Sequence, residues 1–193
     1  MLNQTELVVQ LQQGDETAFK KLVDDYQVMV YNTALGIVQN EDDADDITQE
    51  VFIQVFRSVS SFKGDSKLST WLYRITLGKA LDHEKKKKRK KRFGFVQSLP
   101  GAEGEEQLHP VEFNHPGVKM EKKERANELF NALKQIPDKQ RIAFTLHKLE
   151  GQSYQEVAEI MNTTLYAVES LMGRAKANLK KELKNYYDIN IPE

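Results

Sequence analysis

Apolar residues recur at three- and four-residue spacing through most of this sequence, and this helical period limits its possible folds more than any other feature. The longest run covers residues 19–38, about five helical turns. Its apolar positions are Phe19, Leu22, Val23, Tyr26, Val30, Ala34, Ile37 and Val38. No stretch of any length alternates apolar and polar residues as a strand does. We therefore predict an all-α protein.

Prolines and glycines interrupt the helical period in the middle of the chain. They stand at Pro100, Gly101, Gly104, Pro110, Pro116 and Gly117, and such punctuation is typical of a flexible linker. A chain of 193 residues is long enough for two small domains. We expect one helical domain over residues 1–92, a linker over 93–120 and a second helical domain over 121–187.

Composition excludes several classes of protein. The net charge is −1, so no case for nucleic acid rests on total charge, but residues 85–92 are all basic and residues 41–50 include six acids. The chain has no cysteine, which excludes disulfides and cysteine-based zinc sites. No apolar run approaches the roughly 20 residues of a membrane span, and residues 1–15 do not resemble a signal peptide. We expect a cytoplasmic protein without cofactor, metal or membrane insertion.

The acidic segment predicts a helix with two distinct faces. Its buried stripe consists of Ala44, Ile47, Val51 and Val55. Four residues at i, i+3, i+4 and i+7 share another face and can contact one partner together: Asp46, Gln49, Glu50 and Ile53. Acids at a helix start also favour the helix dipole. That alternative explains the first acids of the segment but does not reach Gln49 and Glu50.

A polar turn over residues 62–67 precedes the next predicted helix. Trp71, Leu72 and Ile75 of that helix are expected to face the core, while Lys67 of the turn and Thr70 and Arg74 are expected to face outward. Aromatic and basic groups around an exposed loop suit unstacked bases and a phosphate backbone. A buried tryptophan beside a solvated charge run is the alternative for any one of these residues considered alone.

The last forty residues predict a helix-turn-helix. Residues 153–156 match a capping box, and residues 162–164 form a polar turn. The final helix is expected to bury Leu165, Val168, Met172, Ala175, Leu179 and Leu183. Its outward face then carries Tyr166, Glu169, Ser170, Gly173, Arg174 and Ala177. A plain helical hairpin is the alternative.

These motifs together resemble a known family. D-A-D-D-I-x-Q-E-x-F, F-K-G and W-L-Y-R-I, within residues 43–75, resemble region 2 of the extracytoplasmic-function (group four) sigma factors of bacterial RNA polymerase. E-G-Q-S-Y-Q-E-V-A-E-I-M and A-V-E-S-L-M-x-R-A-K-x-x-L, within residues 150–179, resemble region 4 of the same factors. The two matches cover all but the linker and the ends of the chain.

The resemblance implies a non-enzymatic protein that binds core RNA polymerase and promoter DNA and is held inactive by an anti-sigma factor. The resemblance also implies that this protein has no small-molecule substrate. The residues implied for core polymerase binding are Asp46, Gln49, Glu50 and Ile53. Those implied for the minus-10 element are Phe62, Lys63, Ser66, Lys67, Thr70, Tyr73, Arg74 and Gly78. Those implied for the minus-35 element are Thr164, Tyr166, Glu169, Ser170, Arg174 and Lys176.

The sequence departs from the family pattern in both regions. Gly78 stands where the family commonly has asparagine, which leaves the minus-10 base read there open. Glu169 and Leu171 replace two usual positive charges, so phosphate attraction should be weaker. Glu169 could accept a hydrogen bond from a cytosine amino group, or it could pair with Arg174 and read nothing. We expect minus-35 recognition without a predicted base sequence.

Two rival functions and one ambiguous segment remain at this point. A helix-turn-helix regulator that acts without polymerase would leave the acidic face and the Trp71 region unexplained. An enzyme is not expected, because the four histidines are scattered and no phosphate loop or Ser/His/Asp set stands in a supporting context. The basic run at 85–92 either binds duplex phosphates without sequence preference or is a disordered, solvated tail or the start of the linker.

Overall fold

The computed structural model describes residues 4–97 and 123–190, and every regular element within those ranges is helical. The first set is α1 (Gln4–Gln12), α2 (Glu16–Val38), α3 (Glu41–Ser58), the short 3₁₀-helix η1 (Val59–Ser61) and α4 (Leu68–Gln97). The second set is α5 (Lys123–Gln135), α6 (Asp138–Phe144), the π-helix η3 (Thr145–Leu149), α7 (Tyr154–Ile160) and α8 (Leu165–Asn190). The predicted all-α class with two helical domains is confirmed. The linker lies outside the described residues except for 93–97, which continue α4, and the domain boundaries stay predictions.

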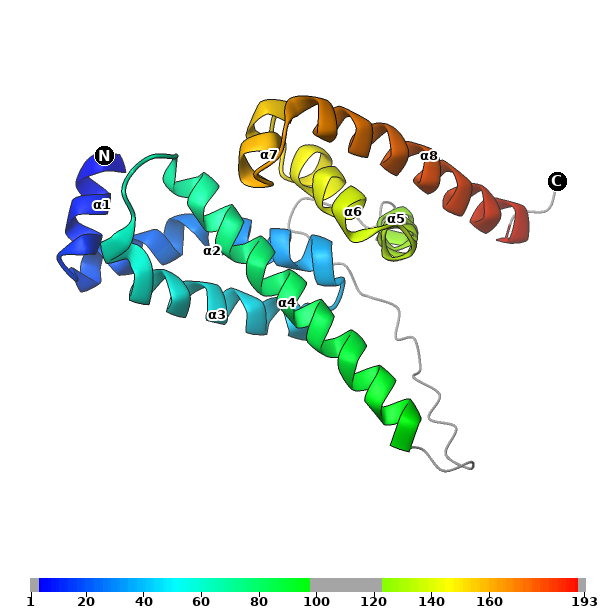
Figure 1. Cartoon of the computed structure of the whole chain (residues 1–193), viewed down its shortest axis with the longest axis horizontal. Coiled ribbons are helices and arrows are strands. Elements are labelled where there is room, and N and C mark those ends of the chain that lie inside the picture. Colours follow the sequence, from blue (N-terminus) through cyan, green and yellow to red (C-terminus); the bar gives the residue numbers. More distant parts are fainter. Residues whose placement is uncertain (1–3, 98–122, 191–193) are drawn as a thin grey trace.

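Side-chain caps set the boundaries of the helices in the first domain. The Asp15 carboxylate accepts a hydrogen bond from the Ala18 amide at 2.8 Å and so caps α2. At the other end of α2, Gln39 adopts a left-handed conformation and Asn40 caps α3 through the Asp43 amide. This tight corner places α2 and α3 side by side, with α4 lying across them (Figure 1). The predicted buried stripe of α3 is confirmed.

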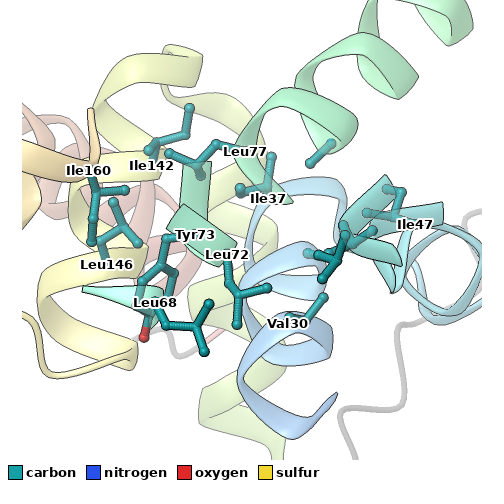
Figure 2. Packing of buried hydrophobic residues seen from close by; sticks show 14 of the residues in the cluster. Val30, Ile37, Ile47, Leu68, Leu72, Tyr73, Leu77, Ile142, Leu146 and Ile160 are labelled. Carbon is teal, nitrogen blue, oxygen red and sulfur yellow. The ribbon is translucent and has the colours of Figure 1, made fainter. Parts of the chain in front are cut away.

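Helix α4 buries two stripes instead of one. Every fourth residue from its start is buried in the first domain: Leu68, Leu72, Thr76 and Ala80. A second stripe, Thr70, Tyr73 and Leu77, is buried as well. Figure 2 shows Tyr73 and Leu77 beside residues of the second domain. The expectation that Thr70 faces outward is therefore wrong: the residue is 3% exposed and lies one turn before Tyr73 on the second stripe of α4.

The second domain contains the predicted helix-turn-helix. Ser153 caps α7 in a complete capping box with Glu156, as predicted. Asn162, in a left-handed conformation, lies in the turn between α7 and α8, and Val168 and Met172 of α8 are buried as expected. Leu165 was expected to be buried but is 43% exposed, because it is the first residue of α8 and lies at the edge of the packed surface.

Candidate nucleic-acid and protein interfaces

Helix α3 presents an acidic face to solvent. Asp46, Gln49 and Glu50 are exposed, and Ile53 is 51% exposed. The structure thus places these predicted residues on one accessible surface. Phe56, which the sequence reasoning missed, extends this face; it is 61% exposed and packs edge-on against Phe19 with ring centroids 5.2 Å apart. Its spacing of seven residues from Gln49 was the available signal.

The loop that follows η1 is held against α1 and carries a hollow. Phe62 is buried and packs against Trp71 with ring centroids 4.9 Å apart, and its carbonyl accepts a hydrogen bond from the Gln12 side chain at 2.8 Å. Gly64 has a φ of +76°, a conformation that favours glycine. The hollow has a volume of about 430 Å³ and is lined by Thr5, Val8, Val9, Gln12, Phe62, Lys63, Gly64 and Ser66. Phe62, Lys63 and Ser66, all predicted DNA residues, thus meet at one cavity.

Two basic residues, Lys67 just before α4 and Arg74 within it, contact the second domain directly. Lys67 Nζ lies 3.0 Å from Glu156 Oε1, and Arg74 Nη2 donates to the Glu159 carbonyl at 2.8 Å. The hydrogen bond to Glu156 raises the pKa of Lys67. In return, the hydrogen bond from Lys67, helped by those from Ser153, lowers the pKa of Glu156 to about 2. These two predicted DNA residues are therefore occupied by α7.

Tyr73 is the buried centre of the same contact. Its hydroxyl donates to Glu150 Oε2 at 3.4 Å and accepts from Gln152 Nε2 at 3.2 Å. Burial raises the pKa of Glu150 to about 7, against the opposing effect of the hydrogen bond from Tyr73. Burial, followed by the charge of Glu150, raises the pKa of Tyr73. The predicted minus-10 residues are thus divided between the hollow and this interdomain contact, while Gly78 lies apart on an exposed surface of α4.

Helix α8 turns a polar face toward solvent. Tyr166 is 79% exposed, Glu169, Arg174 and Lys176 are exposed, and Ser170 is half-buried. Thr164 precedes the helix, and its Oγ1 accepts from the Ala167 amide at 3.2 Å. Thr164 therefore caps α8 in addition to any contact with DNA.

The basic run is helical, because α4 continues through it to Gln97. Its end extends beyond α2 and α3 (Figure 1). Some of its lysines pair with acids: Lys87 with Asp43 at 3.0 Å and Lys88 with Asp138 at 3.3 Å. A disordered tail is therefore wrong for this segment, and phosphate binding by it stays a prediction.

Comparisons with known proteins agree with these surfaces. The sigma-70 region 2 family model matches residues 22–90, and the sigma-70 region 4 model matches residues 126–179. The RNA polymerase sigma-H factor of Pseudomonas aeruginosa is 32% identical over 93% of this chain and 93% of its own length. The chain belongs to the sigma-70 family. Sigma factors bind core RNA polymerase and promoter DNA and have no catalytic activity of their own, so this sigma factor acts in transcription initiation.

Further similarities place the sigma factor among the extracytoplasmic-function group. The ECF RNA polymerase sigma-E factor of Escherichia coli K12 is 32% identical over 92% of this chain and 93% of the relative. The fold is similar to that of the sigma factor RpoE from Bartonella quintana, solved in complex with the anti-sigma factor NepR. That match has a TM-score of 0.65 and 21% identity, and it covers 86% of this chain and 96% of the solved one.

Two kinds of feature are absent from the part of the sigma factor that the structure describes. Within residues 4–97 and 123–190, no three histidine or acidic side chains are grouped so that they could hold a metal ion. None of the helices in those ranges is both long and apolar enough to span a membrane.

Proposed function

We propose that the three surfaces divide the work of promoter recognition. The acidic face of α3 binds core polymerase, the loop and the first turns of α4 bind the minus-10 element, and the outer face of α8 reads the minus-35 element. The observation that carries this proposal is the exposed acidic face of α3, which lies within the region 2 match. A DNA-binding regulator that works without polymerase would not need an exposed acidic face of this kind.

The polymerase contact uses charge and apolar surface together. Asp46, Gln49 and Glu50 supply polar groups, while Ile53 and Phe56 add exposed apolar area. Glu50 is also held by Lys79 Nζ at 3.2 Å, which fixes its position on the face. An apolar centre beside charged groups is the composition of interfaces whose few central residues supply most of the binding free energy. In the sigma-factor resemblance the partner surface is the clamp helices of the largest subunits.

The minus-10 contact uses the hollow beside the loop. A base that leaves the duplex needs an apolar surface to replace its stacking and polar groups to read its edge. The hollow supplies both, because Phe62 and Ser66 are among the residues that line it. Lys63 at its rim attracts the backbone phosphates. Capture of the base in this way offsets part of the cost of opening the duplex.

The minus-35 contact uses the outer face of α8 in the major groove. Tyr166 and Glu169 lie near the start of that helix, where side chains of a recognition helix reach base edges. Arg174 and Lys176 lie further along and suit phosphates. Glu169 favours a cytosine amino group over an acceptor-rich base edge.

The same proposal includes a location and a protein regulator. A factor that works on core polymerase acts in the cytoplasm. Regulation by an anti-sigma protein is supported by the complex of RpoE with NepR, whose sigma subunit has a similar fold. The regulator acts by covering one or more of the three surfaces.

A pair of substitutions tests the polymerase contact. Asp46→Ala with Glu50→Ala should weaken binding to core polymerase at least tenfold, a loss of about 1.4 kcal/mol. The matched control is Glu16→Ala with Asp24→Ala, which removes the same charge from exposed positions of α2 and should change binding less than twofold. Affinity is measured by titration of labelled protein with core enzyme. Equal binding by both pairs would show that α3 is not the contact.

Mapping transcript starts on fragmented genomic DNA tests the promoter contacts. Core polymerase with the wild-type protein should produce new starts that share two spaced upstream elements. The Asp46→Ala, Glu50→Ala pair should lose those starts in parallel with its affinity. Binding to core without new starts would instead indicate a protein that sequesters polymerase.

A further inference from the structure

Helix α1 presents two different faces to the rest of the first domain. Leu7 and Leu11, one turn apart, are buried in the hydrophobic core. A second face, at i, i+3, i+4 and i+7, lines the hollow beside the loop that joins η1 to α4: Thr5, Val8, Val9 and Gln12. Helix α1 lies beside that loop (Figure 1) and is thus a wall of the hollow. It precedes residues 22–90, which match the region 2 family model, so the match assigns no role to this wall.

The apolar part of the wall is left uncovered. Val9 is 47% exposed, and the half-buried Val8 lines the hollow beside it. The ring of Phe62 lines the same hollow. Apolar groups at a concave surface gain free energy when a ligand removes them from water. A nucleobase is flat and has two π-faces that pack against such groups, so α1 and Phe62 together supply apolar surface for one.

The side-chain amide of Gln12 is held in one orientation. Its Nε2 donates to the Phe62 carbonyl at 2.8 Å. A carbonyl oxygen only accepts, so the NH₂ end of the amide must face it, and this determines where the amide oxygen lies. Within the described residues no group donates a hydrogen bond to Gln12 Oε1. The lining of the hollow therefore includes a hydrogen-bond acceptor that is fixed in place and unused.

The other polar groups of the lining are not fixed in this way. Thr5, Lys63 and Ser66 line the hollow, and in the described part of the chain their side chains make no hydrogen bond or ion pair. A hydroxyl group donates or accepts according to its partner, and an ammonium group only donates. Thr5 and Ser66 thus adapt to any base edge, and Lys63 attracts phosphates. Among these described lining residues, Gln12 is the one that discriminates between base edges.

We propose that Gln12 is a specificity-determining residue of the minus-10 contact: its Oε1 accepts from the exocyclic amino group of an unpaired base, so the hollow takes an amino-bearing base in preference to thymine. The inference rests on the proposed function for the entry of a base into the hollow. Cytosine, adenine and guanine carry an amino group at N4, N6 and N2. The one N–H on the pairing edge of thymine lies between two carbonyl oxygens, which repel an approaching acceptor. A poorly paired acceptor in a site without water should lower the binding of thymine about fivefold or more.

A base-substitution series tests this assignment with the full chain and core polymerase. The templates carry each of the four bases in turn at every position of a minus-10 element found by mapping transcript starts. They are mismatched over that element, so that the strength of base pairing does not contribute to opening. Transcript yield is measured for each template. For the wild type we expect one position at which thymine gives about fivefold less transcript, or lower, than the amino-bearing bases.

Two substitutions of Gln12 separate base reading from support of the loop. Gln12→Leu removes both the donor and the acceptor and should abolish the discrimination against thymine at that one position. Gln12→Lys keeps a donor for the Phe62 carbonyl but replaces the acceptor by further donors, so the preference should shift toward thymine, which presents two carbonyl oxygens. A loosened loop cannot produce such a reversal. Gln12 is exposed, so both variants should fold, as measured by circular dichroism.

The matched control is Gln13→Lys. Gln13 is exposed and is not among the residues that line the hollow. This variant has the same change of charge at the neighbouring position, so any general gain in attraction for DNA appears in it as well. It should keep the base preference of the wild type at every position.

Four outcomes would overturn the proposal. They are a wild type that tolerates thymine everywhere, Gln12 variants with unchanged preference, a loss of preference spread evenly over the element, and a Gln13→Lys protein that shows the same reversal. Failure of the proposed function is seen separately. In that case Lys63→Ala with Ser66→Ala would leave the yield from every template unchanged, because no base enters the hollow.

Discussion

Replacement of Gly36 by alanine should stabilise one domain and open the molecule at the same time. Gly36 lies in the last turn of α2, where alanine is more stable than glycine by up to about 1 kcal/mol, so α2 and the first domain gain stability. The new Cβ lies 2.5 Å from Thr145 Cγ2, whereas carbon atoms in contact stay about 3.5–4.0 Å apart. Thr145 Cγ2 must therefore move by about 1 Å, through rotation of its side chain or separation of the two domains at this point. Overpacking of this kind costs about 1–3 kcal/mol, which lowers the ratio of closed molecules, with the domains docked, to open molecules, with the domains apart, roughly 5- to 150-fold.

Two measurements on the full chain separate the opposite effects. Because the protein has no native cysteine, Gln27→Cys and Lys181→Cys place a donor and an acceptor dye at exposed sites of α2 and α8, and energy transfer reports closure. Hydrogen exchange of the α2 amides reports the stability of the first domain. We expect lower transfer together with slower exchange of these amides. The control Gly173→Ala adds a Cβ that meets nothing within 4 Å and should leave transfer unchanged.

A compensating substitution sharpens this test. Thr145→Ala removes Cγ2 and Oγ1 and leaves the Cβ atom 3.4 Å from the added one. The double variant Gly36→Ala, Thr145→Ala should therefore recover part of the energy transfer that Gly36→Ala loses, although it lacks the hydrogen bond from Thr145 Oγ1 to the Gly36 carbonyl. If the single variant keeps wild-type transfer, or the double variant recovers none of the loss, the steric account of Gly36 is refuted.

Three further substitutions test the electrostatics and the local helix chemistry. Burial raises the pKa of Glu150 from 4.5 to about 7 in the closed state, so closure takes up a proton and should weaken as pH rises from about 4.5 through 7. Glu150→Gln should remove this dependence of energy transfer on pH. A pH dependence that persists in this variant would show that another titratable group causes it. Ser153→Ala breaks the capping box of α7 and should lower the free energy of unfolding by about 1 kcal/mol in a denaturant titration, whereas no change would mean that the box contributes nothing. Gly78→Ala adds a Cβ that meets nothing within 4 Å and should raise that free energy by about 0.5–1 kcal/mol; a decrease would indicate a constraint on the backbone there.

Local patterns were sufficient for most of the fold. The buried stripe of α3, the capping box at Ser153 and the outward position of Tyr166 all depend on spacing within one helix. Helical spacing reports which residues share a face, so these features were predictable before any tertiary contact was known. Leu165 was placed wrongly because the first residue of a helix lies at the edge of the packed surface, where spacing alone does not determine burial.

The interdomain contact could not be predicted in this way. Thr70 was expected to face solvent but is buried, and Tyr73, one turn later, bonds Glu150 and Gln152 of the second domain, which is distant in sequence. The pairing of Lys67 with Glu156 spans 89 residues, and no periodic pattern reports a contact of that separation. Gly36, near the end of the longest predicted helix, was at most a weak local signal, because a glycine at that place suits a helix cap as well as a close packing contact.

The second stripe of α4 affects how prone the protein is to aggregate. A chain that opened freely would display Leu77 and Ile142 to water, and contiguous apolar surface of that kind promotes aggregation. In the docked form these side chains are covered, so the docked molecule does not present them to other copies of the chain.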